Sequence, residues 1–249
     1  DLKGKVAIVT GAGQGVGEGI AHALSKLGAK LVVAGRTLSK VEATAADLEA
    51  NGGEALAVEC DVNDAASLEA LVNQTVAHFG GIQILINNAQ EVPLGSLMDV
   101  TDDSFTSGFT SGPLATFRLM KLCHPHLKGD GCIINLASTA AKRWDMSGYG
   151  AYAAVKEGIR SLTRAAACEW AKDGIRTNVI MPHATSPGLA WWIENNPEES
   201  AAFIASIPMQ RVGECEEDIG RAVASFCTDS FAYMNGQSVA LDGGQAHVA

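Results

Sequence analysis

The sequence lacks the features that mark membrane-spanning, nucleic-acid-binding and disulfide-bonded proteins. None of its apolar runs approaches the ~18 residues that a membrane helix requires. Basic residues are in the minority, with 18 Lys and Arg against 28 Asp and Glu and a formal charge of −10. A nucleic-acid partner is therefore not expected, because a phosphate backbone demands a basic surface.

Markers of metal binding and of secretion are also missing. The six cysteines form no CxxC pair, and the six histidines show no spacing typical of metal ligands. No secretory leader is recognisable. We therefore expect reduced thiols, no metal ion and a cytoplasmic location.

The chain does have enough apolar residues for one large core. Of its 249 residues, 47% are hydrophobic and 18% are charged. A chain of this length can bury roughly 70–75% of the surface that it exposes when unfolded. Because no linker or change of composition divides the sequence, we expect a single domain over residues 1–249.

Short apolar runs alternate with segments of helical periodicity along the whole chain. The runs are rich in Val, Ile and Leu without strict alternation, which is typical of strands covered on both faces. This order predicts an α/β fold with a doubly wound, Rossmann-type parallel sheet and helices on both faces. The predicted strands are Lys5–Thr10, Lys30–Ala34, Ala55–Cys60, Ile82–Asn87, Cys132–Ala137, Ile175–Met181 and Gln237–Leu241. The clearest predicted helices are Leu38–Ala50, Asp64–Phe79, Phe117–Leu127, Tyr152–Ala171 and Glu216–Thr228.

Two segments depart from this alternation. The tetrapeptide Phe-Thr-Ser-Gly occurs twice in a row over residues 105–112 and is followed by Pro113, so we expect a helix to break or kink there. Residues 182–208 contain four prolines and the pair Trp191-Trp192. We predict an irregular stretch there, with residues 183–208 forming a mobile loop or lid over the substrate.

A glycine-rich turn, here called the glycine loop, spans residues 10–17 and reads TGAGQGVG. Glycines let the backbone approach a pyrophosphate, whose charge then faces a helix N-terminus. The spacing is not the common GxGxxG, and a tight connection without a ligand is the alternative interpretation. The position of the loop at the first strand–helix junction favours dinucleotide binding. The cofactor contacts predicted in this loop are Gly11, Gly13, Gln14, Gly15, Val16 and Gly17.

The end of the second predicted strand favours NADP(H) over NAD. An NAD site places an acidic residue here to bind the ribose 2′-hydroxyl, whereas this sequence has Gly35, Arg36 and Thr37. The Arg36 guanidinium offers a bidentate fork to the 2′-phosphate of NADP(H). An NAD-linked enzyme remains the alternative, because a surface Arg is usually just solvated.

These features, with Asp61, residues 87–89 (NNA), Ser138 and residues 152–156 (YAAVK), resemble the short-chain dehydrogenase/reductase family. The resemblance extends from the glycine loop to the ending NGQSVALDGG at residues 235–244. It implies a nicotinamide cofactor, hydride transfer between a secondary alcohol and a ketone, a small-molecule substrate and a homotetramer. It also implies that the cofactor is contacted by Thr37, Asp61, Val62, Asn88, Ala89, Tyr152, Lys156, Pro182 and Thr185.

The chemistry of the catalytic group can be argued from the residues themselves. Tyr152 and Lys156 are four residues apart, so on a helix they share one face. A nearby ammonium, together with the positive nicotinamide, favours the phenolate and so lowers the phenol pKa. Tyr152 can then exchange a proton with the substrate oxygen, to which Ser138 can also hydrogen-bond. Ser138, Tyr152 and Lys156 are the predicted catalytic residues.

The sequence departs from the family pattern near this group. Gln90 replaces a glycine, and Gly112 stands where the family has a catalytic asparagine, thirteen residues before Pro125. We expect any proton relay there to use water or the backbone, and Gly112→Ala to retain activity. His183 follows Pro182 in place of a glycine, and Pro187 replaces a threonine for which Thr185 is the nearest substitute.

Bulky apolar side chains predict the substrate class. Trp144 lies between Ser138 and Tyr152, Trp192 lies in the expected lid, and Gln90 lies on the nicotinamide side. We expect these residues to contact a bulky, mostly apolar substrate such as a hydroxysteroid or an aryl ketone. The alternatives are a 3-oxoacyl-thioester reductase and a protein that senses NADP(H) without catalysis.

Overall fold

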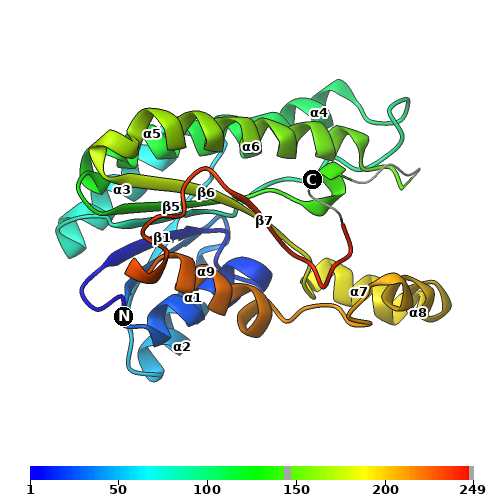
Figure 1. Cartoon of the computed structure of the whole chain (residues 1–249), viewed down its shortest axis with the longest axis horizontal. Coiled ribbons are helices and arrows are strands. Elements are labelled where there is room, and N and C mark those ends of the chain that lie inside the picture. Colours follow the sequence, from blue (N-terminus) through cyan, green and yellow to red (C-terminus); the bar gives the residue numbers. More distant parts are fainter. Residues whose placement is uncertain (143–146, 247–249) are drawn as a thin grey trace.

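Seven parallel strands form one sheet in the order β3-β2-β1-β4-β5-β6-β7 (Figure 1). The computed structural model describes residues 1–142 and 147–246. Each end of a predicted strand lies within two residues of the observed one, which confirms the doubly wound α/β prediction. The strands are β1 (Val6–Thr10), β2 (Lys30–Gly35), β3 (Glu54–Glu59), β4 (Ile84–Asn87), β5 (Gly131–Leu136), β6 (Ile175–Pro182) and β7 (Ser238–Leu241).

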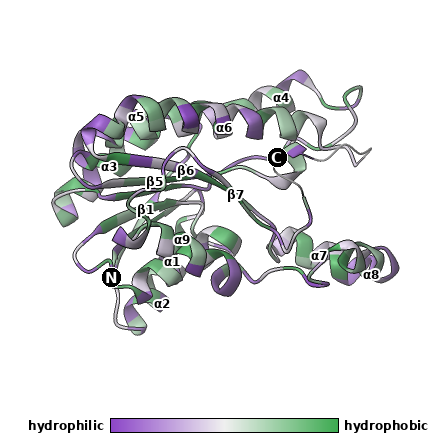
Figure 2. Ribbon diagram, viewed as in Figure 1, coloured by the Kyte–Doolittle hydropathy of each residue, from purple (hydrophilic) through white to green (hydrophobic). Residues whose placement is uncertain are grey.

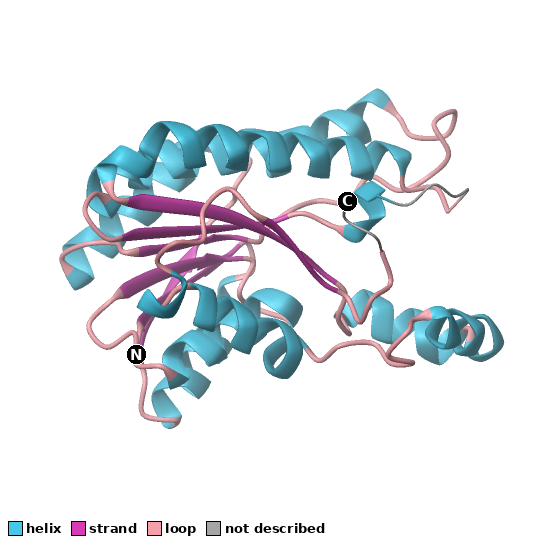
Figure 3. Cartoon of the chain, in the orientation of Figure 1, coloured by secondary structure: helices cyan, strands magenta, loops and turns pink. Residues whose placement is uncertain are grey.

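Helices cover both faces of the sheet (Figures 1 and 3). One face is covered by α1 (Gly15–Lys26), α2 (Leu38–Ala50) and α9 (Arg221–Phe226). The other is covered by α3 (Ala65–Phe79), α5 (Ala115–Leu127) and α6 (Gly150–Trp170). The shorter helical segments are η2 (Thr139–Lys142), η3 (Ala171–Asp173), η4 (Cys215–Gly220) and η5 (Asp229–Phe231).

This two-sided covering explains why the strands show no alternation of apolar and polar residues. In β1, Ala7 and Val9 pack into the cluster beneath α1, whereas Ile8 packs into the cluster beneath α3 and α5. All three side chains are fully buried. Figure 2 accordingly shows the central strands as predominantly hydrophobic. Among the described helices, none is long and apolar enough to cross a membrane.

The repeated tetrapeptide does not end a helix, which corrects the expected break. Helix α4 (Asp102–Phe109) continues through the π-helical segment η1 (Thr110–Leu114) into α5. The wider π turn accommodates Pro113 within the helix. The glycines serve close packing instead, since a Cβ atom on Gly108 would lie 2.8 Å from Pro93 Cγ.

The expected loop over residues 183–208 is largely helical, which corrects that prediction. It contains α7 (Pro187–Asn195) and α8 (Pro197–Ser206), which lie at one end of the molecule (Figure 3). Pro187 and Pro197 occupy the first turns, where a helix makes no use of the missing N–H, so they start helices rather than break them. The Ser186 hydroxyl caps α7 by accepting from the Leu189 N–H at 3.3 Å.

Candidate active site

The glycine loop is held by the end of β4. A Cβ atom on Gly17 would lie 2.4 Å from the Gly11 carbonyl oxygen, so only glycine lets α1 begin this close to its own loop. The Asn88 side chain donates to the Thr10 and Gly11 carbonyls at 2.9 and 3.1 Å. Thr10 Oγ1 accepts from the Asn88 and Ala89 N–H groups at 3.0 and 3.1 Å. The loop is thus a preformed cradle that fits a pyrophosphate, and Asn88 and Ala89 brace it.

Two cations lie beside this cradle at the start of α2. Arg36 follows β2 directly, and its guanidinium lies 2.6 Å from a Glu91 carboxylate oxygen. Lys40, in the first turn of α2, donates to Gln14 Oε1 at 2.6 Å. Sequence reasoning missed Lys40 and Glu91. Lys40 does carry a signal, because a cation is disfavoured at the positive end of a helix unless an anion binds there.

The predicted adenine contacts lie after β3, at the same edge of the sheet. Asp61 Oδ1 accepts from the backbone and side-chain N–H groups of Asn63 at 3.0 and 3.1 Å. Val62 is buried in the cluster beneath α3. Asp61 follows β3 and Arg36 follows β2, and these two strands are neighbours in the sheet.

The three predicted catalytic residues are brought together at the carboxyl end of β5. Ser138 follows this strand and forms a hydrogen bond with Tyr152 of α6. The Lys156 ammonium lies 5.4 Å from the centre of the Tyr152 ring and donates to the Leu136 carbonyl at 2.7 Å. Both α6 side chains are therefore anchored against the end of β5.

Burial dominates the protonation of this group in the protein alone. It raises the pKa of Tyr152 to about 12, although the Ser138 hydrogen bond acts in the opposite direction. Burial also lowers the pKa of Lys156 to about 7. The expected lowering of the phenol pKa by the ammonium together with the nicotinamide charge stays a prediction for the cofactor complex. Tyr152 is a protonated phenol at neutral pH, which is the state that donates a proton to a carbonyl.

The space beside Gly112 is filled by Gln90. A Cβ atom on Gly112 would lie 2.7 Å from Val155 Cγ1 and 3.1 Å from Gln90 Nε2. A methyl group at residue 112 would therefore require the Val155 side chain to shift, and the expected tolerance of Gly112→Ala stays a prediction. Neither polar atom of the Gln90 carboxamide has a hydrogen-bond partner among the described residues.

The segment that contains α7 and α8 carries the remaining predicted contacts. Pro182 ends β6, and the Thr185 N–H donates to the Gly213 carbonyl at 2.9 Å. Trp192 is half-buried and lies edge-on to Phe203 of α8, with ring centres 5.8 Å apart. Phe203 in turn lies edge-on to His183 at 5.4 Å. Trp144 lies outside the described residues.

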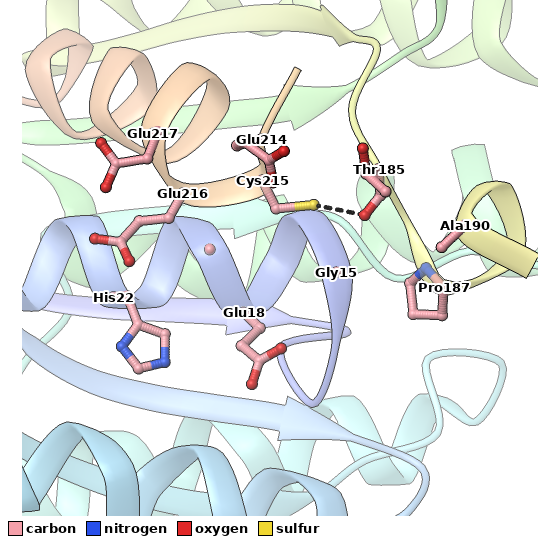
Figure 4. Close-up of a pocket in the computed structure, with 11 residues that line it drawn as sticks. Gly15, Glu18, His22, Thr185, Pro187, Ala190, Glu214, Cys215, Glu216 and Glu217 are labelled. Carbon is pink, nitrogen blue, oxygen red and sulfur yellow. Dashed lines mark hydrogen bonds between the residues drawn. The ribbon is translucent and has the colours of Figure 1, made fainter. Parts of the chain in front are cut away.

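A groove of about 470 Å³ runs along the outer side of α1 (Figure 4). Because four carboxylates surround it, this groove is unsuited to a phosphate. The groove is lined by Gly15, Glu18, Gly19, His22, Thr185, Pro187, Ala190, Glu214, Cys215, Glu216 and Glu217. Among the described residues, no cluster of His, Cys, Asp and Glu could hold a metal ion.

This combination of a glycine cradle, a doubly wound sheet and a Ser-Tyr-Lys group is typical of a dinucleotide-dependent oxidoreductase. A family model described as enoyl-(acyl carrier protein) reductase matches residues 11–246. The 12alpha-hydroxysteroid dehydrogenase of Clostridium sp. is 40% identical, over 97% of this chain and 96% of that protein. The chain belongs to the short-chain dehydrogenase/reductase family.

Solved structures support the same placement. A variant of actinorhodin polyketide ketoreductase, crystallised with NADPH, superposes with a TM-score of 0.92 and 28% identity over 98% of each chain. A blue fluorescent protein from a metagenomic library, in complex with NADPH, has a TM-score of 0.90 and 31% identity over 99% of each chain. This likeness supports a nicotinamide cofactor for the present chain.

Proposed function

We propose that the protein is an NADP(H)-dependent oxidoreductase that interconverts a secondary alcohol and a ketone, with Tyr152 as general acid and base. The observation that carries this proposal is the Ser138-Tyr152-Lys156 group at the carboxyl end of β5, in which Lys156 is buried and the other two side chains are half-buried. It lies at the edge of the sheet where the glycine loop begins α1. A nicotinamide cofactor in that loop would supply or accept the hydride.

Each side chain of the group has a separate task. The Tyr152 phenol, protonated at neutral pH, donates its proton to the carbonyl oxygen during reduction. The Ser138 hydroxyl forms hydrogen bonds with the same substrate oxygen and with the phenol, and so orients one toward the other. The Lys156 ammonium lies near the phenol and favours its charged form when a proton must be accepted from an alcohol.

Two observations support NADP(H) as the cofactor. Arg36 and Lys40 both lie at the N-terminus of α2, and no acidic residue occurs in the first turn of that helix. A 2′-phosphate there would meet two cations and the positive end of a helix. Thr37 precedes the helix as its N-cap and offers its backbone to the same anion.

The substrate proposed is bulky and mostly apolar, with a hydroxysteroid as the leading candidate. Trp192 and Phe203 present aromatic rings in the segment expected to cover the substrate. Residues 188–207 contain no Lys or Arg, which disfavours an acyl-thioester substrate whose carrier is anionic. A relative that is 40% identical over 97% of the chain is named a 12alpha-hydroxysteroid dehydrogenase, which supports the same choice.

We also infer assembly into a homotetramer. Exposed apolar residues gather along α4, η1 and α5, where Phe105, Leu114 and Phe117 remain 41%, 38% and 42% exposed. They line an apolar hollow of about 370 Å³ together with Phe109 and Pro113. An apolar surface of this kind on helices is typical of a contact between protein copies.

The test of the proposed activity separates binding from catalysis. NADPH binding is followed by fluorescence titration, and turnover is measured on a panel of steroid, acyl-thioester, sugar and aryl ketones. We expect NADPH-dependent reduction of bulky ketones by the wild type. In Tyr152→Phe we expect kcat to fall by at least ~100-fold with little change in NADPH affinity, since acid–base catalysis contributes about 10²–10⁴-fold.

Two outcomes would contradict this function. NADPH binding without turnover of any ketone would favour the sensing protein. Near-normal turnover by Tyr152→Phe would remove Tyr152 from the mechanism.

A further inference from the structure

The Gln90 carboxamide is a buried amide that the proposed mechanism leaves unused. Its Oε1 and Nε2 atoms are both shielded from solvent and have no partner among the described residues. Leaving both atoms unpaired costs free energy, because each has lost the hydrogen bonds that it makes with water. Such groups in native proteins are paired with a ligand, an ion or an ordered water molecule.

The position of this amide connects it to the catalytic helix. Gln90 follows β4 and reaches the space beside Gly112 of η1, where a Cβ atom would lie 3.1 Å from its Nε2 and 3.2 Å from its Cδ. The same Cβ atom, built on Gly112, would lie 2.7 Å from Val155 Cγ1. Val155 comes three residues after Tyr152 and directly before Lys156, so the amide lies against the part of α6 that carries both.

Lys156 has hydrogen-bonding capacity to spare. Its ammonium has three N–H donors, and the Leu136 carbonyl accepts one of them at 2.7 Å. Only 4% of the residue is exposed, so bulk water does not satisfy the rest. An amide oxygen is a suitable acceptor for such a donor, either directly or through one bridging water molecule.

We propose that Gln90 is a positioning residue that holds the Lys156 ammonium beside Tyr152 through a bridging water molecule. The proposal rests on the proposed function, because it assigns Lys156 a role in the reaction. It differs from the expectation that Gln90 contacts the substrate, since the carboxamide packs against η1 and α6. It also fits the glycine at residue 112, because a side chain there would crowd both this amide and Val155.

Gln90→Met tests the proposal by removing the polar atoms while keeping a side chain of similar length. We expect kcat to fall by about 10-fold or more, with KM and NADPH affinity within about twofold of wild type, because the proposal places the amide in contact with neither ligand. The alkaline limb of the kcat–pH profile should move to lower pH, since the ammonium loses an acceptor that favours its charged form. Gln74→Met on the exposed face of α3 is the matched control.

Gln90→Glu should shift the kcat–pH profile in the opposite direction, with a side chain of almost the same volume. A carboxylate at this point favours the charged ammonium more strongly, so the alkaline limb should move to higher pH. A side chain that only fills space would show no such opposed shifts. Thermal unfolding of each variant checks that the fold is kept.

The outcomes separate this inference from the proposed function. Absence of turnover in the wild type would overturn the function itself. With an active wild type, a Gln90→Met enzyme that keeps the wild-type kcat and pH profile would overturn the positioning role, whatever Gln90→Glu does. A fall in NADPH affinity of the same size as the fall in kcat would also overturn it, because the amide would then act on cofactor binding.

Discussion

Arg36 shows how one residue can decide cofactor choice and how a neighbour can oppose it. Its guanidinium lies 2.6 Å from a Glu91 carboxylate oxygen. If Arg36 binds the 2′-phosphate of NADP(H) as proposed, that phosphate and the Glu91 carboxylate compete for one cation. Both side chains are substantially exposed, so the ion pair itself contributes little stability.

This competition predicts opposite effects on NADPH affinity. Arg36→Asp should weaken NADPH and improve NADH, because it removes a charge-assisted phosphate contact and adds an acceptor for the 2′-hydroxyl. Glu91→Gln should strengthen NADPH about two- to fivefold and leave NADH unchanged, since an exposed pair is worth ~0.2–1 kcal/mol. Fluorescence titration with both cofactors measures these effects. Arg164→Asp on the exposed face of α6 is the control, and equal NADPH affinity in all variants would contradict the argument.

Local sequence signals predicted those site residues whose position depends on one strand or helix. The glycine loop follows from the first strand–helix junction, and the Tyr152-Lys156 pair follows from the helical repeat. The pairing of Gln90 with Gly112 could not be predicted, because it joins the end of β4 to η1 through packing that leaves no local pattern. Glu91 was missed for the same reason, since its partner Arg36 lies 55 residues earlier.

At the scale of secondary structure, the pattern of apolar residues predicted the elements better than the positions of proline did. Both faces of each strand are covered by helices, so nearly every strand residue is apolar and the run of apolar residues marks the strand. The strand ends were therefore predicted to within two residues. The prolines of α7 and α8 were read as breakers, although Pro187 and Pro197 lie in first turns. Proline is unfavourable for the helical turn before it and favourable in a first turn, so Pro187 and Pro197 each start a helix.

The α7–α8 segment offers a matched pair of tryptophans for testing the substrate pocket. Trp192 is half-buried against Phe203, whereas its neighbour Trp191 is 64% exposed. We expect Trp192→Ala to lower kcat/KM for a bulky apolar ketone by about 10-fold or more and to spare a small ketone, because the apolar wall contacts only the larger substrate. Trp191→Ala should change neither value.

Steady-state kinetics with one small and one bulky ketone measure both variants. If Trp192→Ala lowers the two kcat/KM values equally, Trp192 is an anchor of α7 on α8 and not part of the pocket. A loss of thermal stability of the same variant without a change in kcat/KM would lead to the same conclusion.

For the whole molecule, net charge opposes the association of copies of the chain and exposed apolar surface favours it. A formal charge of −10 makes copies of this chain repel one another, so association requires a surface whose burial outweighs that repulsion. The exposed aromatic side chains along α4, η1 and α5 provide such a surface on the sheet face opposite α1 and α9 (Figure 1). Sequence alone implied assembly only through family resemblance, because exposure of these side chains depends on how the helices pack.

Phe117→Glu should dissociate the proposed tetramer into smaller species, because it places a charge in the centre of an apolar contact between acidic chains. Sedimentation velocity of wild type and variant at micromolar concentration measures the change, with Tyr233→Glu, at a fully exposed position between η5 and β7, as the control. Added salt should favour the wild-type assembly by screening the net charge. A wild type that sediments as a monomer at all salt concentrations, or a Phe117→Glu variant that sediments like the wild type, would show that this surface is not the contact.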